Sequence, residues 1–475
     1  MADTLQVPDS NSRSLHEHRR FGYWAGHFVV VGSMIGAGIL TTSGYTLRDT
    51  GNPIALLVLW AVGGVLAICG ALTVAELATA LPHSGGDYVF AREAYGREAG
   101  FVSGWATFVL GFAAPTAVVA HLALTYLLQP YLANLESVLP SGLLASLVPT
   151  GATVLILVVT VIHTQGHRPS TWLQLVATIL TATILLGLAV GGILFGQGNW
   201  SHLAVGGWPT GPQWSALAIG LIYVSYAYAG WNAAGYLAGE IRDPSRILPR
   251  CLIGGAATVT VLYLLVNLTY VYALNPATLQ EKSDNEVKRV AELAVVALFG
   301  ETTAQVISAA LGLCLIASVS AFMLTGPRIA FAMARDGVFP RFAARLHPVR
   351  GTPALAIVTQ AAIAIGLVWA GTFRELLDYA AIGLVVLSGL TVASVFPLRR
   401  RVGLSHPYRL PAYPLPPLAY LFLTIWTVGY ALSEPERRGP ALLSLATLLL
   451  GLPLCWLIPE NGTQRPLDRH SPASG

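Results

Sequence analysis

The chain has 475 residues, of which 54% are hydrophobic and 11% are charged, and its mean hydropathy is +0.63. About 25% of the residues of an ordinary soluble domain are charged, so this composition excludes a soluble protein of this size and indicates a membrane protein. The formal net charge of +4 is spread over many short segments, and we expect no nucleic-acid partner.

The N-terminal segment, residues 1–20, is polar and includes Arg13, Arg19 and Arg20. The apolar run that follows has no small-residue cleavage site behind it, so this segment lacks the design of a signal peptide. We therefore expect a cytoplasmic tail over residues 1–20 and a first apolar run that stays in the membrane.

The first apolar run carries three glycines between Gly32 and Gly38. Each glycine inside a helix costs about 1 kcal/mol relative to alanine, so the cluster predicts a point at which the helix unwinds. The alternative is a packing face, because small residues four apart, such as Gly32 and Gly36, let membrane helices approach closely.

Apolar runs continue along the whole chain. A hydrocarbon core about 30 Å thick needs about 20 apolar residues per helix. The sequence predicts twelve such spans, at residues 22–48, 53–81, 99–130, 143–163, 171–196, 213–239, 250–274, 303–334, 353–371, 376–396, 413–432 and 439–458. With a cytoplasmic N-terminus, 20 of the 27 Lys and Arg residues fall inside and 7 outside, as the positive-inside rule requires. Both termini are therefore expected in the cytoplasm.

His121 lies within the third span and has two interpretations. It is either a proton-coupling group or substrate contact, or a neutral histidine hydrogen-bonded within the helix bundle. The four cysteines all fall in apolar stretches without a CxxC pair. We therefore expect neither a disulfide framework nor a metal site, and no helper subunit linked by a disulfide.

The sixth span contains the segment Tyr226 to Asn232, with Gly230 near its middle. Its position corresponds to that of the first glycine cluster, five spans earlier. Unwound backbone is tolerated inside a bilayer only where protein or a wet cavity satisfies its N–H and C=O groups. Paired interruptions at equivalent places in two halves indicate a transporter site.

The ends of interrupted helices carry partial charges. The N–H groups around Gly36, Ala37 and Gly38 lie at the positive end of a half-helix and suit a carboxylate. Carbonyl groups near Ile35 and near Tyr226 and Ala229 lie at negative ends and suit an ammonium group. The two breaks together are thus complementary to a zwitterion, and the rings of Tyr226 and Trp231 could close over it as a gate.

Five motifs in this order resemble the amino acid-polyamine-organocation transporter superfamily, and in particular its L-type amino acid transporter branch. They lie at residues 32–39, 76–88, 226–232, 240–250 and 326–337. The resemblance implies an all-α fold of twelve membrane helices, with a five-plus-five inverted repeat of the leucine-transporter type and discontinuous first and sixth helices. The divisions would be a tail at 1–20, repeats at 21–200 and 201–400, two peripheral helices at 401–460, and a tail at 461–475.

The resemblance also assigns roles to residues. The substrate carboxylate would bind at Ile35, Gly36, Ala37 and Gly38, and the amino group at carbonyls of Ile35, Tyr226 and Ala229, with Asn232 nearby. Many relatives carry a lysine in the fifth span where this sequence has Thr181. Ser318 and Ser320, with Thr181, could bind a coupling sodium ion, although serines in membrane helices often bond only to their own backbone.

We therefore expect a secondary transporter of neutral amino acids in the cell membrane, working by alternating access as an exchanger or ion-coupled symporter. The alternative is a permease for cationic amino acids or polyamines. We expect no cofactor beyond a possible Na⁺ or H⁺ coupling ion, and a monomer or homodimer. The sequence has no HExxH motif or paired carboxylates in mid-span, which argues against an enzyme, and no filter-like repeat, which argues against a channel.

Overall fold

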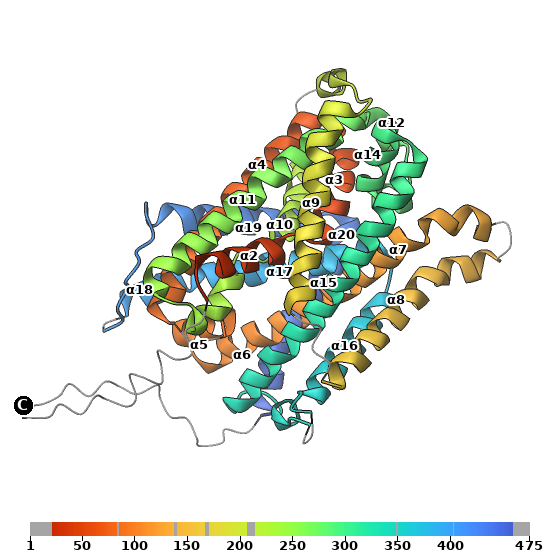
Figure 1. The fold of residues 1–475 in the computed structure, drawn as a ribbon. Coiled ribbons are helices and arrows are strands. Elements are labelled where there is room, and N and C mark those ends of the chain that lie inside the picture. The colour runs from red at the N-terminus through yellow and green to blue at the C-terminus, as the bar shows by residue number, and fades with distance from the viewer. Residues whose placement is uncertain are drawn as a thin grey trace, which may run out of the picture. The chain divides into compact units, whose positions relative to one another are not determined.

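The structure, a computed structural model, describes residues 21–82, 85–136, 140–166, 171–206, 214–347, 350–401 and 403–458. Within these ranges nearly all regular structure is helical (Figure 1). One isolated bridge pairs Phe21 with Ile241. The two expected tails, 1–20 and 461–475, lie outside the described residues, as do His83 and Ser84 of the second motif.

The helices follow the apolar runs of the sequence. In chain order they are α2 (Tyr23–Met34), α3 (Ala37–Thr50), α4 (Pro53–Ala80), α5 (Asp87–Tyr95), α6 (Arg97–Ala106), the π-helix η1 (Thr107–Ala113), α7 (Ala114–Glu136), α8 (Ser141–Thr164), α9 (Thr171–Phe195), the 3₁₀ helix η2 (Trp200–Ala204), α10 (Trp214–Tyr228), the 3₁₀ helix η4 (Ala233–Glu240), α11 (Pro244–Ala273), α12 (Pro276–Gln280), α13 (Asp284–Val287), α14 (Val290–Phe299), α15 (Glu301–Arg335), the 3₁₀ helix η5 (Arg341–Ala344), α16 (Ala354–Trp369), α17 (Phe373–Ala393), α18 (Val395–Arg400), α19 (Leu415–Ser433) and α20 (Pro435–Trp456).

Membrane-crossing length is reached by nine helices of the described residues, and by ten if the bent pair α2 and α3 counts as one span. The two other expected runs hold the shorter helices α10, of 15 residues, and α16, of 16 residues. The prediction of an all-helical chain with many apolar spans is confirmed. The count of twelve spans stays a prediction.

The chain divides into two compact units. The first comprises the described residues within Met1–Ala94, Ala182–Gly300 and Ser388–Tyr430, and the second those within Tyr95–Thr181, Glu301–Leu387 and Ala431–Gly475. Each unit therefore joins segments that are far apart in the sequence. This division by compactness does not test the expected division into consecutive repeats, which stays a prediction.

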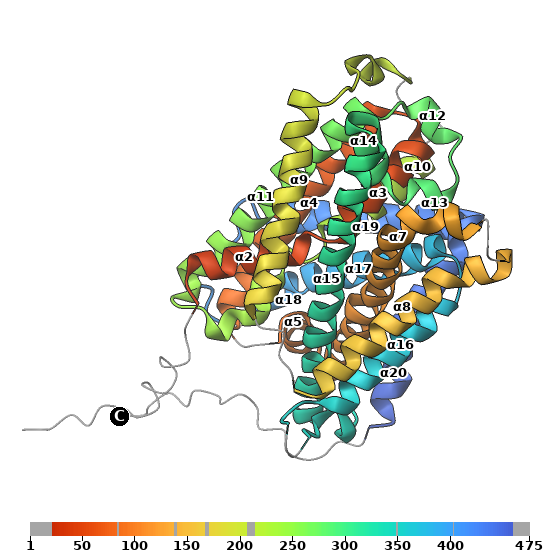
Figure 2. The same cartoon turned by 45° about the vertical axis from the view of Figure 1, so that its right-hand side comes forward.

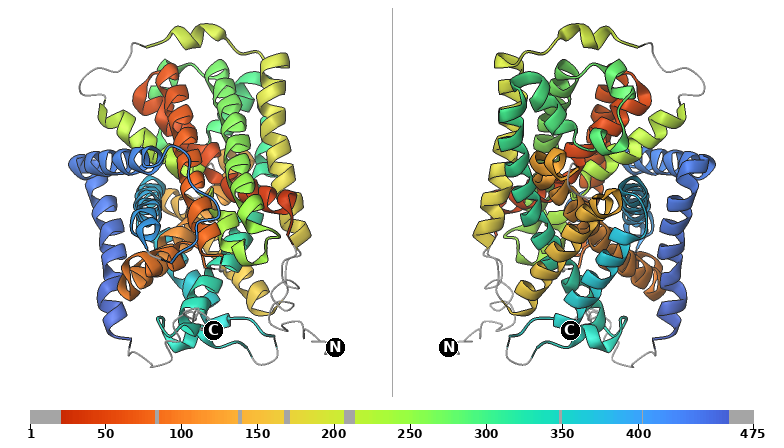
Figure 3. Two further views of the ribbon diagram at one scale, coloured as in Figure 1. Left: turned by 90° about the vertical axis from the view of Figure 1, so that its left-hand side faces the viewer. Right: turned by 90° about the vertical axis from the view of Figure 1, so that its right-hand side faces the viewer.

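In the first unit α11 packs along α4 and α2, and α10 packs against α3 and α4. Figure 3 shows α11, in green, running beside the orange-red α4. Small residues allow these approaches, because a Cβ at Gly255 would lie 2.6 Å from Val30 Cγ1 and one at Gly64 would overlap Thr260. Close packing through small residues is the usual way in which membrane helices associate.

In the second unit α15 packs along α7, α8 packs against α7 and α16, and α20 packs against α6. Figure 2 shows α8 beside α16. Gly312 of α15 approaches Leu127 closely, since a Cβ there would lie 2.7 Å from Leu127 Cγ. A buried ion pair between Arg437 and Asp378 joins α20 to α17.

Large apolar side chains are exposed on the outer faces of several long helices. Val154, Leu157 and Val161 of α8 are exposed, as are Phe422 and Ile425 of α19. Apolar patches of this extent on helices of membrane-crossing length face lipid rather than water. This apolar surface is therefore the kind expected of a protein embedded in a bilayer.

Candidate substrate site at two helix breaks

The first break lies within the first predicted span, between α2 and α3. Helix α2 ends at Met34, Ile35 and Gly36 are extended, and α3 begins at Ala37. The two helices differ in direction by 43°. The break therefore creates a helix C-terminus and a helix N-terminus inside one apolar run.

Gly36 and Gly38 at this break differ in what an added side chain would contact. Gly36 has φ −158° and ψ −152°, a conformation open to any residue, and a Cβ at Gly36 would meet nothing within 4 Å. A Cβ at Gly38 would lie 2.6 Å from Ala227 Cβ and would overlap the Ala227 backbone. Gly38 is thus required by contact with α10, whereas Gly36 borders open space.

The second break follows α10, which ends at Tyr228. Ala229 N–H donates to Tyr226 O at 3.1 Å, and Ala233 N–H donates to Gly230 O at 3.0 Å. Gly230 has φ +105°, in the region that favours glycine. The chain then continues as the 3₁₀ helix η4 rather than as an α-helix.

The two breaks contact each other within the first unit. A Cβ at Gly230 would lie 2.5 Å from Ser33 O, so the turn after α10 lies directly against the C-terminal end of α2. Together with the contact between Gly38 and Ala227, this places both sides of the first break beside the end of α10 and the turn that follows it. The pairing of the breaks, which the sequence could only suggest by position, is a direct contact.

Tyr263 of α11 is a residue of the site that sequence reasoning missed. Its hydroxyl lies 2.7 Å from Met34 O and 3.2 Å from Ala227 O, so that it can donate to a carbonyl at either break. The side chain is buried. Tyr270, two turns further along α11, donates to Ile39 O at 3.2 Å. The spacing of these two tyrosines on one helix face is the signal that could have revealed them.

The arrangement leaves dipole ends available to a ligand. The first N–H groups of α3 have no carbonyl partner within their own helix, and they lie at its positive end. The bond from Tyr263 to Met34 uses one carbonyl of the α2 terminus, while Ser33 beside it is exposed. Such a site can hold an anionic and a cationic group without any charged side chain.

The two predicted gate residues are buried in the structure. Tyr226 is 7% exposed and Trp231 is 3% exposed. The Trp231 ring packs against Tyr420 of α19, with centroids 5.9 Å apart, and fills the space beside Gly70 of α4. Burial of both rings is compatible with a closed gate, and the role of each as a gate stays a prediction.

Asn232 lies at the second break, but its amide is engaged by a carboxylate. Its Nδ2 donates to Asp87 Oδ1 at 3.1 Å and to Oδ2 at 3.2 Å, and Tyr236 donates to Oδ2 at 2.7 Å. Burial raises the pKa of Asp87, against the opposing effect of these hydrogen bonds and one from Thr391. Asn232 thus links the break to a buried carboxylate at the start of α5.

The three residues predicted for a coupling ion belong to the second unit, and each has a protein partner. Ser318 donates to Cys314 O at 3.5 Å and Thr181 donates to Ala177 O at 2.8 Å, both in their own helices. Ser320 Oγ lies 3.0 Å from His163 Nε2. Among the residues that the structure describes, no group of three or more His, Cys, Asp or Glu side chains is placed to hold a metal ion.

His121, for which the sequence left two interpretations, is 9% exposed. Its ring packs against Phe373, with centroids 5.0 Å apart. Both residues belong to the second unit. This environment agrees with a histidine held within the helix bundle, and a coupling role stays untested.

A profile of the family described as amino acid permease matches residues 21–449. The chain belongs to the amino acid permease family. Among its relatives, it is 28% identical to the mouse Asc-type amino acid transporter 1 over 443 residues, covering 90% of this permease and 79% of the relative. It is 29% identical to the human large neutral amino acids transporter small subunit 2 over 446 residues, covering 90% and 78%.

The match to a bacterial relative spans a larger share of that relative's length. The serine/threonine exchanger SteT of Bacillus subtilis (strain 168) is 27% identical over 433 residues, covering 90% of this permease and 93% of the relative. The family and these relatives agree with the L-type resemblance read from the five motifs. The permease is a multi-pass membrane transporter and not an enzyme.

Proposed function

We propose that this permease carries neutral amino acids across the cell membrane by alternating access, as an exchanger or an ion-coupled symporter. The contact between its two helix breaks is the observation that carries the proposal. At that contact the N–H end of α3 borders open space at Gly36, and carbonyl ends of α2 and α10 lie beside it. An amino acid presents one carboxylate and one ammonium group, which match these two kinds of helix end.

This geometry and the L-type resemblance support the site residues of the proposal. The carboxylate would bind the backbone of Ile35, Gly36, Ala37 and Gly38, and the ammonium group carbonyls of Ile35, Tyr226 and Ala229. Asn232 would act from the edge of the site, and Tyr226 and Trp231 would form the gate. The names of the relatives, which include transporters of large neutral amino acids and an exchanger of serine and threonine, support neutral substrates.

The proposed architecture extends beyond what the helices alone establish. It consists of twelve spans, with five-helix repeats at 21–200 and 201–400, peripheral helices at 401–460 and cytoplasmic termini. The permease would act as a monomer or homodimer without a disulfide-linked subunit and without a cofactor. Na⁺ or H⁺ would serve as coupling ion if flux is not pure exchange, with Ser318, Ser320 and Thr181 as the sodium ligands.

Uptake by the purified permease in proteoliposomes tests the function directly. Radiolabelled alanine, serine and leucine are supplied outside, with and without internal amino acids, a sodium gradient and a pH gradient. Exchange predicts uptake only with internal substrate, whereas symport predicts uptake driven by one of the two gradients. Absence of saturable uptake of every neutral amino acid under all four conditions would contradict the proposal.

A permease for cationic amino acids or polyamines is the second candidate. The buried carboxylate of Asp87, which accepts from Asn232 at the second break, is the observation that favours it. Competition separates the two candidates. Neutral transport predicts that excess alanine or leucine inhibits uptake and that arginine and putrescine do not, and the cationic candidate predicts the reverse.

A further inference from the structure

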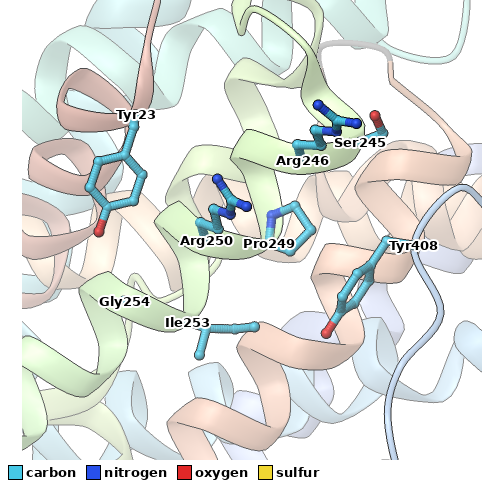
Figure 4. Close-up of a pocket in the computed structure, with 8 residues that line it drawn as sticks. All are labelled: Tyr23, Ser245, Arg246, Pro249, Arg250, Ile253, Gly254 and Tyr408. Atoms are coloured by element: carbon cyan, nitrogen blue, oxygen red, sulfur yellow. The ribbon is translucent and has the colours of Figure 1, made fainter.

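A pocket of about 730 Å³ lies in the first unit, away from the residues of the substrate site. Its lining comes from the start of α2, the first turns of α11 and the connection between α18 and α19 (Figure 4). The lining residues are Tyr23, Ser245, Arg246, Pro249, Arg250, Ile253, Gly254 and Tyr408. Figure 4 shows the two arginines on α11 between the flanking rings of Tyr23 and Tyr408.

The polar end of the pocket carries concentrated positive charge. Arg246 and Arg250 are four residues apart on α11 and therefore share a helix face. Both are exposed, and Arg246 Nε lies 3.9 Å from Asp243 Oδ2. Asp243 also accepts from the Ser245 hydroxyl at 2.8 Å. At 3.9 Å an exposed ion pair is weak, which leaves the guanidinium groups available to an anion.

The other end of the pocket is apolar. Pro249 lies between the two arginines, and Ile253 and Gly254 follow them along α11, which continues as an apolar helix of membrane-crossing length to Ala273. From Ser245 to Ile253 the helix rises by about 12 Å. The pocket thus changes from cationic to apolar along a helix that enters the bilayer.

Exposed aromatic residues beside the pocket predict that it lies at the depth where headgroups meet hydrocarbon. Trp24, next to Tyr23, is 66% exposed, and Phe28 one turn further along α2 is also exposed. Exposed tryptophan at the end of a membrane helix is typical of the interface between water and lipid. Arg246 and Arg250 belong to the predicted cytoplasmic side, whose leaflet carries the anionic lipids.

The walls of the pocket are held in place by contacts within the first unit. Phe21 N–H donates to Glu240 O at 3.0 Å and Arg242 N–H donates to Phe21 O at 2.9 Å, which fixes the start of α2 beside the start of α11. The Tyr23 hydroxyl lies close to Gly254, where a Cβ would be only 3.1 Å away. The connection carrying Tyr408 is fixed to α4, because Leu410 N–H donates to the buried Glu76 carboxylate at 2.8 Å.

We infer that this pocket binds the phosphate headgroup of an anionic phospholipid, with the arginines holding the phosphate and the apolar end receiving the start of an acyl chain. Guanidinium groups bind phosphate by charge-assisted hydrogen bonds, and the hydroxyls of Tyr23 and Tyr408 can add neutral ones. A soluble phosphate shares the headgroup chemistry but would leave the apolar end of the pocket unused. Basic pockets between membrane helices on the cytoplasmic side suit such headgroups.

Thermal unfolding of the purified permease in a neutral detergent measures this binding without reference to transport. The probes are phosphatidylglycerol, phosphatidylcholine and glycerol 3-phosphate, each titrated at constant detergent and salt. A ligand that binds the folded state alone raises Tm with its concentration. We expect phosphatidylglycerol to raise Tm, and the other two probes to have little effect.

Arg246→Gln with Arg250→Gln removes both guanidinium groups of the pocket. This double variant should weaken phosphatidylglycerol binding by about tenfold or more. Arg345→Gln with Arg409→Gln is the matched control, because it removes two exposed arginines of the same predicted side that do not line the pocket. Size exclusion and circular dichroism establish that both double variants are folded.

The outcomes are distinct. Loss of the phosphatidylglycerol effect in the pocket variant alone supports the inference. Equal loss in the control variant would mean that lipid is attracted by general surface charge, and a full effect in the pocket variant would place the lipid elsewhere. Stabilisation by glycerol 3-phosphate as large as that by the lipid would overturn the lipid assignment in favour of a soluble phosphate. None of these outcomes depends on which substrate is carried.

Discussion

Gly36 is the residue at which a side chain would test the substrate site most directly. Its backbone conformation is open to any residue, and an added Cβ would meet nothing within 4 Å. Gly36→Leu should therefore fold normally and occupy the space that the carboxylate needs. We expect uptake to fall by at least about tenfold, because charge-assisted hydrogen bonds to backbone N–H groups are lost, while Tm and expression stay near those of the unmodified permease.

Gly187→Leu is the matched control for this prediction. Gly187 lies in α9, is exposed, and also has no atom within 4 Å of an added Cβ. The same substitution there should leave uptake unchanged. Normal uptake by Gly36→Leu, measured in the same proteoliposomes, would mean that the substrate binds away from the first break.

Asp87 gives a prediction on pH dependence at the residue scale. Burial raises its pKa above the ordinary value of 3.8, so the folded protein binds the proton more tightly than the unfolded chain. The stabilising contribution of protonated Asp87 is full below the unfolded pKa, and it is lost as pH rises through the raised folded pKa. As pH rises, the Tm of the unmodified permease should therefore fall relative to the Tm of Asp87→Asn.

Thermal unfolding of both proteins from about pH 4 to pH 8, the span over which a raised carboxyl pKa titrates, measures this shift. Glu281→Gln is the control, because Glu281 is an exposed carboxylate of the same unit. A difference between Asp87→Asn and the unmodified permease that stays constant with pH would contradict a raised pKa for Asp87. Transport at the same pH values would show whether this proton also affects the second break.

At the scale of elements, the sequence predicted where helices run and where they stop. The length of the apolar runs predicted the long helices, and the glycine cluster at residues 32–38 predicted the break between α2 and α3. Helix α10 ends at Tyr228, within the segment Tyr226 to Asn232 where the sequence predicted an interruption, but the 3₁₀ geometry of η4 was not predicted. The turn at Gly230 lies against Ser33 O, a tertiary contact that no local pattern encodes.

The partners of the site residues were also beyond the sequence. Asn232 was predicted beside the substrate, but its bond to Asp87 joins positions 145 residues apart. The hydroxyl of Tyr263 reaches Met34 from 229 residues away. Residue type and spacing indicate which backbone groups an unwound helix exposes. The side chain that bonds them is decided by packing between helices.

The contact between the breaks is itself testable. Gly230 combines φ +105° with a Cβ position 2.5 Å from Ser33 O, whereas Gly337 has φ +74° and nothing within 4 Å. Gly337→Ala should lose about 1 kcal/mol for its left-handed backbone alone. Gly230→Ala should lose more than about 3 kcal/mol, because strain and a backbone clash add.

Chemical unfolding of the two variants and the unmodified permease measures this difference. The excess loss in Gly230→Ala belongs to the contact between the turn after α10 and the end of α2. Equal losses in the two variants would mean that the breaks are not in firm contact. Uptake by the Gly230 variant should fall further than its stability explains, because the two helix ends that we propose to bind the substrate would separate.

For the whole molecule, the charge asymmetry of the loops predicts an orientation that labelling can measure. Glu281 and Arg438 are exposed and fall on the predicted outer side, and Arg345 and Arg409 are exposed and fall on the inner side. Three of the four native cysteines are buried, and Cys69 is partly exposed. Single cysteines at the four positions in a Cys69→Ala background therefore report accessibility with little background.

An impermeant maleimide on intact cells should label Glu281→Cys and Arg438→Cys, and should label Arg345→Cys and Arg409→Cys only after permeabilisation. The positions are chosen around the 16-residue α16, the shortest helix expected to span the membrane after Arg345. If α16 does not cross, Arg409 moves to the side opposite Arg345, because α17 alone then separates them. Labelling of all four positions with the reverse sidedness would instead overturn the positive-inside orientation while keeping the span count.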